Sequence, residues 1–108
     1  MAGRRRLRKE DDYETYFACA GGTGILREEC WVDESGEVVR YNLAFLLPHL
    51  QRADNGRVLG FDNAHGVHER HYFGEVTVVD FETYSATTRR FYREMQSIRR
   101  LYENKIFC

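Results

Sequence analysis

The clearest pattern along the chain is a strict alternation of apolar and other side chains between residues 38 and 47. One face of this segment is wholly apolar and consists of Val39, Tyr41, Leu43, Phe45 and Leu47. A period of two is typical of a half-buried β-strand, because successive side chains of a strand point to opposite sides. Pro48 follows directly and cannot donate a hydrogen bond to a neighbouring strand, so we expect the strand to end there.

Three other segments have the features of shorter strands. Residues 25–32 end at the turn-forming sequence Asp33-Glu34-Ser35-Gly36. The sequence Asp54-Asn55-Gly56 supplies residues that accept positive φ angles, so we expect a hairpin that pairs residues 57–61 with the alternating strand. After a polar loop, residues 76–79 are expected to form a short fourth strand.

The C-terminal segment has the period of an amphipathic helix. Its apolar residues recur at intervals of four, three and four, at Phe91, Met95, Ile98 and Tyr102. Thr83 is the expected N-cap, and Glu82 lies just outside, where negative charge suits the helix dipole. These patterns predict an α+β fold, in which an antiparallel β-meander of three or four strands is packed by a long C-terminal α-helix.

The N-terminal residues follow neither period. Residues 1–22 begin with a basic block, continue into an acidic one and end among glycines, so we expect a basic/acidic arm that is partly mobile. The length of 108 residues fits one domain, and residues 23–108 are predicted to form a single α+β domain. No apolar run approaches the roughly 20 residues that cross a bilayer, so a membrane partner is not expected.

Composition excludes a fully disordered chain, since 43% of the residues are hydrophobic and 31% are charged. The net charge of −1 hides an uneven distribution: residues 4–9 carry +5, residues 10–88 carry −10 and residues 89–105 carry +4. The two basic ends therefore bear more on partners than the total does. Because the three cysteines form no CxxC pair and no secretory signal precedes them, we expect a cytoplasmic protein.

The densest group of functional side chains lies between residues 62 and 72. Three of the four histidines fall here, at His65, His68 and His71. Histidine titrates near neutrality, so His68 and His71 could act as acid and base in cleaving RNA next to a ribose 2′-hydroxyl. Arg70 would contact the phosphate, and Asp62 and Asn63 would orient the reacting groups. Such cleavage requires neither a metal ion nor another cofactor.

Two other interpretations of this segment stay open. The three histidines, with Asp62, could bind zinc or another divalent ion, although their spacing matches no known zinc site. Alternatively, Asp62, Asn63 and Gly66 simply make turns and the histidines are solvated. The grouping of three histidines with an arginine favours function, because functional residues concentrate on loops that a rigid scaffold holds.

The same segment resembles a known family. Gly60-Phe61-Asp62-Asn63, then Gly66 and His68-Glu69-Arg70-His71, resemble the core motif of the TumE-type small bacterial toxins. The resemblance extends over residues 25–103 and includes Phe81-Glu82-Thr83 at the start of the helix and Phe91 ten residues later. It implies the toxin half of a toxin–antitoxin pair, with RNA as its target and a DNA-binding antitoxin as its partner. Asp62, Asn63, His68, Arg70 and His71 match the motif by position, whereas Glu69 departs from it.

The predicted helix offers a second candidate surface. Arg89, Arg93 and Arg100 lie opposite its apolar stripe and could bind a phosphate backbone, or could form only a solvated face. The basic block at residues 4–9 could contact RNA or the antitoxin, or have no role.

The sequence thus predicts a toxin-like protein that acts on RNA, with metal-independent acid–base cleavage by the histidine-rich loop as the first hypothesis. The alternatives are a non-enzymatic module that binds nucleic acid or protein through the basic helix, and a divalent-metal-binding protein. The expected partners are RNA and a cognate DNA-binding antitoxin protein, and a homodimer stays open.

Overall fold

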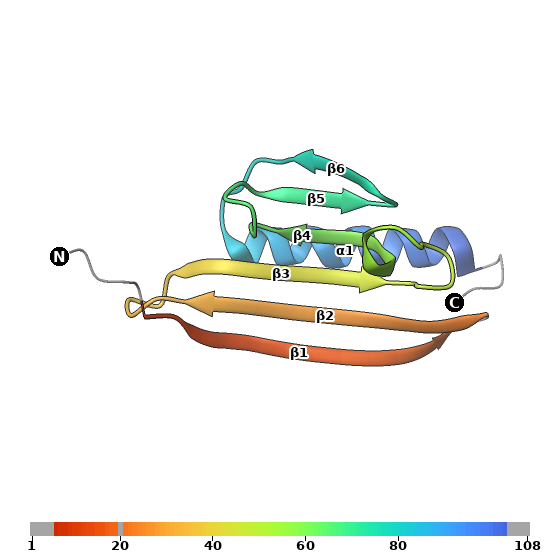
Figure 1. Ribbon diagram of the computed structural model, residues 1–108, viewed down its shortest axis with the longest axis horizontal. Helices are drawn as coiled ribbons and strands as arrows, with labels where there is room; N and C mark the ends of the chain where they lie inside the picture. The colour runs from red at the N-terminus through yellow and green to blue at the C-terminus, as the bar shows by residue number, and fades with distance from the viewer. Residues whose placement is uncertain (1–5, 20, 104–108) are drawn as a thin grey trace.

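Six strands and one α-helix follow one another in the part of the chain that the computed structural model describes, residues 6–19 and 21–103 (Figure 1). The strands are β1 (Arg8–Cys19), β2 (Gly22–Val32), β3 (Val38–Leu46), β4 (Arg57–Asp62), β5 (Glu69–Tyr72) and β6 (Glu75–Val78). The helix is α1 (Tyr84–Glu103).

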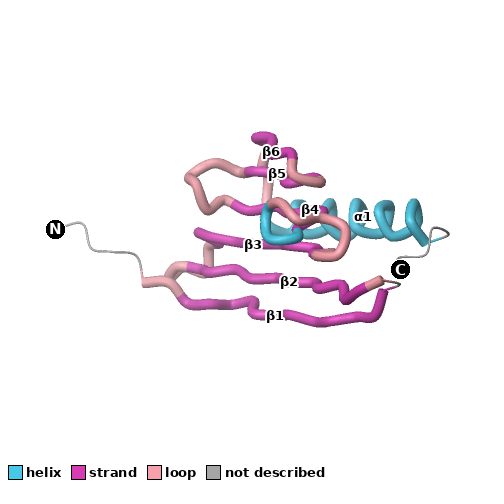
Figure 2. Tube along the Cα trace, turned by 45° about the vertical axis from the view of Figure 1, so that its right-hand side comes forward, coloured by secondary structure: helices cyan, strands magenta, loops and turns pink. Residues whose placement is uncertain are grey.

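All the strands belong to one sheet in chain order, and each is antiparallel to the next. The helix α1 packs across one face of this sheet, where it contacts β3 and β4 (Figures 1 and 2). The predicted α+β class, an antiparallel meander packed by a C-terminal helix, is therefore confirmed. The predicted number of strands is wrong, since the sheet has six rather than three or four.

The strand β1 occupies the region that the sequence predicts to be an arm, so the prediction of an arm over residues 1–22 is wrong for residues 8–19. Its ladder with β2 runs from Arg8 opposite Val32 to Cys19 opposite Gly22. Most of its described side chains are exposed, because an edge strand is held by main-chain hydrogen bonds along one side and buries few side chains. Such a strand shows no apolar period. Residues 4 and 5 of the basic block lie outside the described residues.

The core lies between α1 and the sheet. The alternation in β3 predicts it well, since at most 1% of the surface is exposed at Tyr41, Leu43, Phe45 and Leu47. The helix fills the other side with Phe91, Met95 and Ile98, which confirms these three positions of the predicted stripe. The side chain of Tyr102 lies outside the described ones.

The two predicted local signals at the ends of elements are confirmed. In the 3-10 helix Asp54–Gly56, which directly precedes β4, the φ angles are positive at Asp54 (54°), Asn55 (55°) and Gly56 (86°). At the start of α1, the Thr83 hydroxyl accepts a hydrogen bond of 3.0 Å from the amide of Ala86, as an N-cap does. Within the described residues, no helix has both the length and the apolar character that crossing a membrane requires.

The last two strands lie where the sequence predicts mainly loop. β5 (Glu69–Tyr72) forms in the middle of the predicted polar loop, so the prediction of loop there is wrong. Its side chains are polar on both faces of the sheet, so no apolar alternation marks it as a strand. β6 covers Glu75–Val78, close to the predicted residues 76–79.

Candidate functional site

The two faces of the sheet differ in their cover. Phe61 and Arg70 reach α1, through Phe91 and Glu94 respectively. Because strand side chains alternate, their sequence neighbours point to the opposite face, which the α-helix of the described residues does not cover. We call this the uncovered face. It carries the side chains of Asp62 and His71.

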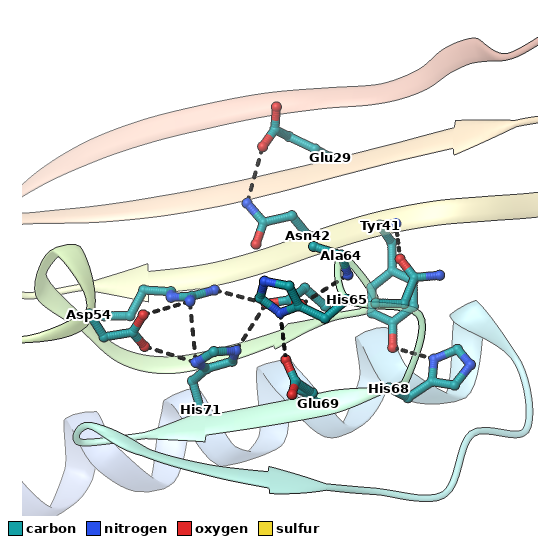
Figure 3. A network of polar contacts seen from close by, with 12 residues as sticks. Glu29, Tyr41, Asn42, Asp54, Ala64, His65, His68, Glu69 and His71 are labelled. Carbon is teal, nitrogen blue, oxygen red and sulfur yellow. Dashed lines mark hydrogen bonds and ion pairs between the residues drawn. The ribbon is translucent and has the colours of Figure 1, made fainter.

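A polar cluster forms on the uncovered face, which we define as Asp54, Arg57, Asp62 and His71 (Figure 3). The Arg57 guanidinium donates to Asp54 Oδ1 at 2.6 Å and to Asp62 Oδ2 at 3.0 Å. The 3-10 turn supplies Asp54, and β4 supplies Arg57 and Asp62. His71 belongs to β5, where it lies opposite Gly60 of β4.

Gly60 makes this arrangement sterically feasible. A Cβ atom at Gly60 would lie 3.1 Å from Cδ of Arg57, which is tighter than ordinary contact. The arginine can therefore lie across the glycine and reach Asp62, two residues further along the same face. A glycine inside a strand often marks such a close approach.

The side chains of the polar cluster are largely buried. Exposed fractions are 7% for Asp62, 6% for His71 and 18% for both Asp54 and Arg57. Burial alone would lower the pKa of Arg57, but hydrogen bonds and charges from Asp54 and Asp62 outweigh it and raise the pKa. Arg57 is therefore a permanent cation between two carboxylates.

His71 is held at both ring nitrogens. Nδ1 lies 2.9 Å from Asp54 Oδ2 and 3.2 Å from Arg57 Nη2, so it donates to the carboxylate or accepts from the guanidinium. Nε2 lies 3.0 Å from Asp62 Oδ2, but it is buried and has no hydrogen-bond partner among the described residues, so this contact lacks the direction of a hydrogen bond. Asp62, Glu69 and His71 each offer a ligand atom, and these three atoms lie within 4.8 Å of one another.

The three histidines of the predicted loop do not converge. His68 stacks on Phe81 with ring centroids 4.0 Å apart, and its Nδ1 lies 2.8 Å from the Tyr41 hydroxyl. His65 is exposed and lies 3.1 Å from Glu69. Figure 3 accordingly shows His68 beside Tyr41 and His71 beside Asp54. The structure thus does not bring His68 and His71 together as an acid–base pair.

Burial also changes the hydroxyl that His68 contacts. Loss of hydration, with a smaller contribution from the charge of Asp62, raises the pKa of Tyr41 to about 12. The Tyr41 hydroxyl therefore stays protonated at neutral pH and can donate to His68.

Two other predicted site residues have structural contacts. Asn63 accepts a hydrogen bond from the Tyr41 amide at 3.0 Å and donates to the Val39 carbonyl at 2.9 Å, so it ties the loop to β3. Arg70 donates twice to Glu94 of α1, at 2.8 and 2.6 Å. Arg70 therefore faces the helix, away from the face that carries His71.

Of the predicted catalytic residues, the structure thus brings only Asp62 and His71 together. Sequence reasoning missed Asp54, Arg57 and Glu69. In the sequence, Asp54 is accounted for as a turn residue and Arg57 as a strand residue, so neither indicates a functional site. Gly60 in β4 is the signal that could have indicated the close packing of Arg57.

A hollow of about 250 Å³ lies beside the polar cluster on the uncovered face. Its lining includes Trp31, Arg40, Asn42, Arg57, Asp62 and His65. The ring of Trp31 is flanked by two cations, with Lys9 Nζ at 5.0 Å and Arg40 Cζ at 5.1 Å from its centre. The hollow gives Asp62 and Arg57 access to solvent despite their burial.

The predicted basic residues of α1 form a different kind of surface. Arg89, Arg93 and Arg100 are exposed, and none of them pairs with a carboxylate among the described side chains. We call these three the arginine stripe. Among the described residues, Arg89 donates only to the Ser85 hydroxyl, at 2.9 Å. A hollow of about 300 Å³ adjoins the stripe near the start of α1, and Arg89 and Arg93 line it.

Comparisons of this chain with models of protein families, with curated proteins and with solved structures gave no match. The resemblance to the TumE-type toxins therefore stays a prediction from the sequence motif.

Proposed function

We propose that the protein binds nucleic acid, RNA foremost, through the arginine stripe of α1. The observation that carries this proposal is that Arg89, Arg93 and Arg100 are exposed and have no carboxylate partner among the described side chains. Arg90 of the same helix differs from these three, because it forms an ion pair with Glu94 at 2.6 Å. An unpaired guanidinium keeps its donors free for the oxygens of a phosphate.

The spacing of the stripe suits an extended polyanion. A helix rises about 1.5 Å per residue, so the stripe runs for roughly 16 Å along α1. Each phosphate that it neutralises releases counterions. For single-stranded nucleic acid, three contacts would weaken binding about 20-fold between roughly 50 and 200 mM salt.

The test is fluorescence anisotropy with labelled single-stranded RNA, double-stranded RNA and DNA at several salt concentrations. The triple variant Arg89→Gln, Arg93→Gln, Arg100→Gln is expected to lose most of the binding and most of the salt dependence. The matched control, Arg27→Gln, Arg40→Gln, Arg52→Gln, removes the same charge from the sheet and a loop and is expected to bind normally. Equal loss in both variants would reject the stripe as the site.

The biological setting that we propose is a toxin-like component of a bacterial toxin–antitoxin pair in the cytoplasm. The support is the sequence motif, together with a basic surface that fits RNA. Induced expression should arrest growth, and a DNA-binding protein from the adjacent gene should relieve the arrest. Undisturbed growth, with full expression of folded protein, would count against this setting.

Cleavage of RNA that binds at the uncovered face, separately from the arginine stripe, is a second candidate function, and the contact of Asp54 with His71 favours it. Asp54 contacts Nδ1 of His71, as carboxylates do when they orient a general base, so Nε2, which is buried against Asp62, would take the proton once substrate displaces that contact. The chain would then use His71 without His68. Bulk RNA incubated in EDTA should be cut by wild type and by His68→Gln, but not by His71→Gln. Intact RNA with wild type, with and without added metal, would end this reading.

A further inference from the structure

We propose that Asp62, Glu69 and His71 bind a divalent transition-metal ion, Zn²⁺ or Mn²⁺, on the uncovered face. One ligand atom from each residue lies within 4.8 Å of the other two. This site differs from the one that the sequence suggests, because His65 and His68 take no part in it. It also lies on the face opposite to the helix, so it is independent of the arginine stripe.

Strand register creates the site. Asp62 of β4 and Glu69 of β5 are direct partners in the ladder, and His71 lies two residues beyond Glu69 on the same face. Two like charges directly opposite each other destabilise a pair of antiparallel strands. Arg57 beside Asp62 and His65 beside Glu69 offset part of that repulsion, and a bound cation would offset the rest.

The charge balance around the site also calls for a cation. Asp54, Asp62 and Glu69 supply three carboxylates, while Arg57 supplies one guanidinium. With His71 neutral, the group has a formal charge of −2, which one divalent ion neutralises. The carboxylate of Glu69 is 16% exposed, so little solvent screens it.

The buried nitrogen of His71 is the strongest single indication. In the part of the chain that the structure describes, Nε2 has no hydrogen-bond partner, although Oδ2 of Asp62 lies only 3.0 Å away. Two ligand atoms that each lie about 2.1 Å from one ion are separated by roughly 3.0–3.4 Å at usual bond angles. The observed separation fits two atoms bound to the same metal, and a metal bond would satisfy a nitrogen that is otherwise costly to bury.

The contacts around the three ligands support this assignment. Asp54 lies against Nδ1 of His71, as carboxylates do when they orient a metal-binding imidazole. The amide of Ala64 donates to Oδ1 of Asp62 at 3.1 Å, and Oδ2 faces both the ring of His71 and the Arg57 guanidinium. Rotation of the Glu69 side chain, which now contacts His65, brings its oxygen the remaining distance.

The ligand types select the ion. An imidazole nitrogen with two carboxylates suits Zn²⁺ or Mn²⁺ better than Mg²⁺ or Ca²⁺, which prefer oxygen ligands alone. Three protein ligands leave at least one coordination position open, as catalytic metal sites do. Of the three ligands, Asp62 lines the neighbouring hollow, from which water or a small anion would approach the metal.

The test uses the full chain without an affinity tag, freed of metal with EDTA and then titrated calorimetrically with Zn²⁺, Mn²⁺, Mg²⁺ and Ca²⁺. We expect one Zn²⁺ or Mn²⁺ per chain and a rise in melting temperature with free metal, since a ligand of the folded state stabilises it. Glu69→Gln should weaken binding at least about tenfold, because even the loss of an outer-shell partner costs about 10–100-fold.

Two matched controls decide where the metal binds. Glu75→Gln removes the same charge from the neighbouring strand, and His68→Gln removes an imidazole outside the cluster, so both should bind as wild type does. Asp62→Asn serves as the second ligand variant, with circular dichroism to check folding. Absence of Zn²⁺ and Mn²⁺ binding in wild type, or equal affinity of wild type and folded Glu69→Gln, would overturn the proposal. Loss of binding in His68→Gln alone would do so as well.

Discussion

Arginines and carboxylates meet on both faces of the sheet, but their charges balance differently on the two faces. On the side that α1 covers, Glu94 accepts hydrogen bonds from both Arg70 and Arg90, so two cations share one anion. On the uncovered face, the polar cluster and Glu69 together hold three carboxylates and one guanidinium. The cluster around Glu94 therefore has a surplus of positive charge, and the cluster around His71 a surplus of negative charge.

The difference separates structural contacts from candidate functional ones. The contacts of Glu94 join α1 to β5, and both oxygens of its carboxylate accept hydrogen bonds. The polar cluster keeps a buried ring nitrogen with no hydrogen bond to any described residue, and its Arg57 and Asp62 line a hollow. Arg70 and His71 are sequence neighbours, yet strand alternation sends one to the helix and the other to the uncovered face. Both residues belong to the same motif, but we expect only His71 to act in binding.

The largest effect on stability should come from the core of the covered face. Phe91→Ala removes a fully buried ring that meets Phe61 edge-on, and it should lower the free energy of unfolding by about 4 kcal/mol. Denaturation in urea measures the change. Val78→Ala, at an exposed position of β6, is the control and should change stability by less than about 0.5 kcal/mol. Similar values for both variants would mean that α1 does not pack as described.

The second prediction tests the surplus of negative charge in the polar cluster. Arg57→Gln leaves Asp54 and Asp62 without their cation, which should lower the free energy of unfolding by about 3 kcal/mol. Added Zn²⁺ should restore part of this loss, because the cluster becomes more negative and binds the ion more tightly. Melting curves with EDTA and with Zn²⁺ measure both changes. Arg40→Gln, an arginine with no carboxylate partner among the described residues, is the control; an equal loss there would contradict the argument.

A smaller effect is expected on the covered face. Glu94→Gln weakens the charged hydrogen bonds to Arg70 and Arg90 and should lower the free energy of unfolding by about 1–2 kcal/mol. Its affinity for Zn²⁺ should equal that of wild type, because Glu94 lies on the other side of the sheet. A change in affinity as large as that of Glu69→Gln would abolish the distinction between the two faces.

The smallest effect concerns pH. The pKa of Tyr41 is raised from 10 to about 12 in the folded protein, so the folded state holds this proton more tightly than the unfolded state does. The resulting stability is complete below pH 10 and is lost as the pH rises through 12. Ultraviolet absorbance of tyrosinate, compared between wild type and Tyr41→Phe, isolates this group. A Tyr41 signal that titrates at pH 10 would show that the ring is solvated.

Much of the fold could be predicted because its strongest signals are local. The alternation in β3 and the stripe from Phe91 to Ile98 each come from one element that buries one face against the core. The turn at Asp54–Gly56 and the cap at Thr83 depend on the backbone and side chain of a few adjacent residues. By contrast, β1 and β5 are held by main-chain hydrogen bonds to β2 and β4, and their polar side chains reveal neither.

The candidate site was predicted only in part, because only some of its residues are close together in the sequence. Asp62 and His71 stand in one short segment, so composition was enough to single them out. Glu69 has a meaning only once β5 is known to pair with β4, since register alone places it opposite Asp62. Asp54 and Arg57 belong to a different turn and strand, and only packing across Gly60 joins them to His71.

The sequence by itself determined the α+β class, the buried faces of β3 and α1, and the positions of the arginine stripe. These follow from periods of two and of three to four residues, which local geometry imposes on any strand or helix. Only the tertiary structure decided that the histidines diverge, that Arg70 serves the helix, and that His71 joins Asp62 and Glu69. Those results depend on strand pairing and on which face a residue meets, and a shift of one residue in register would reverse them.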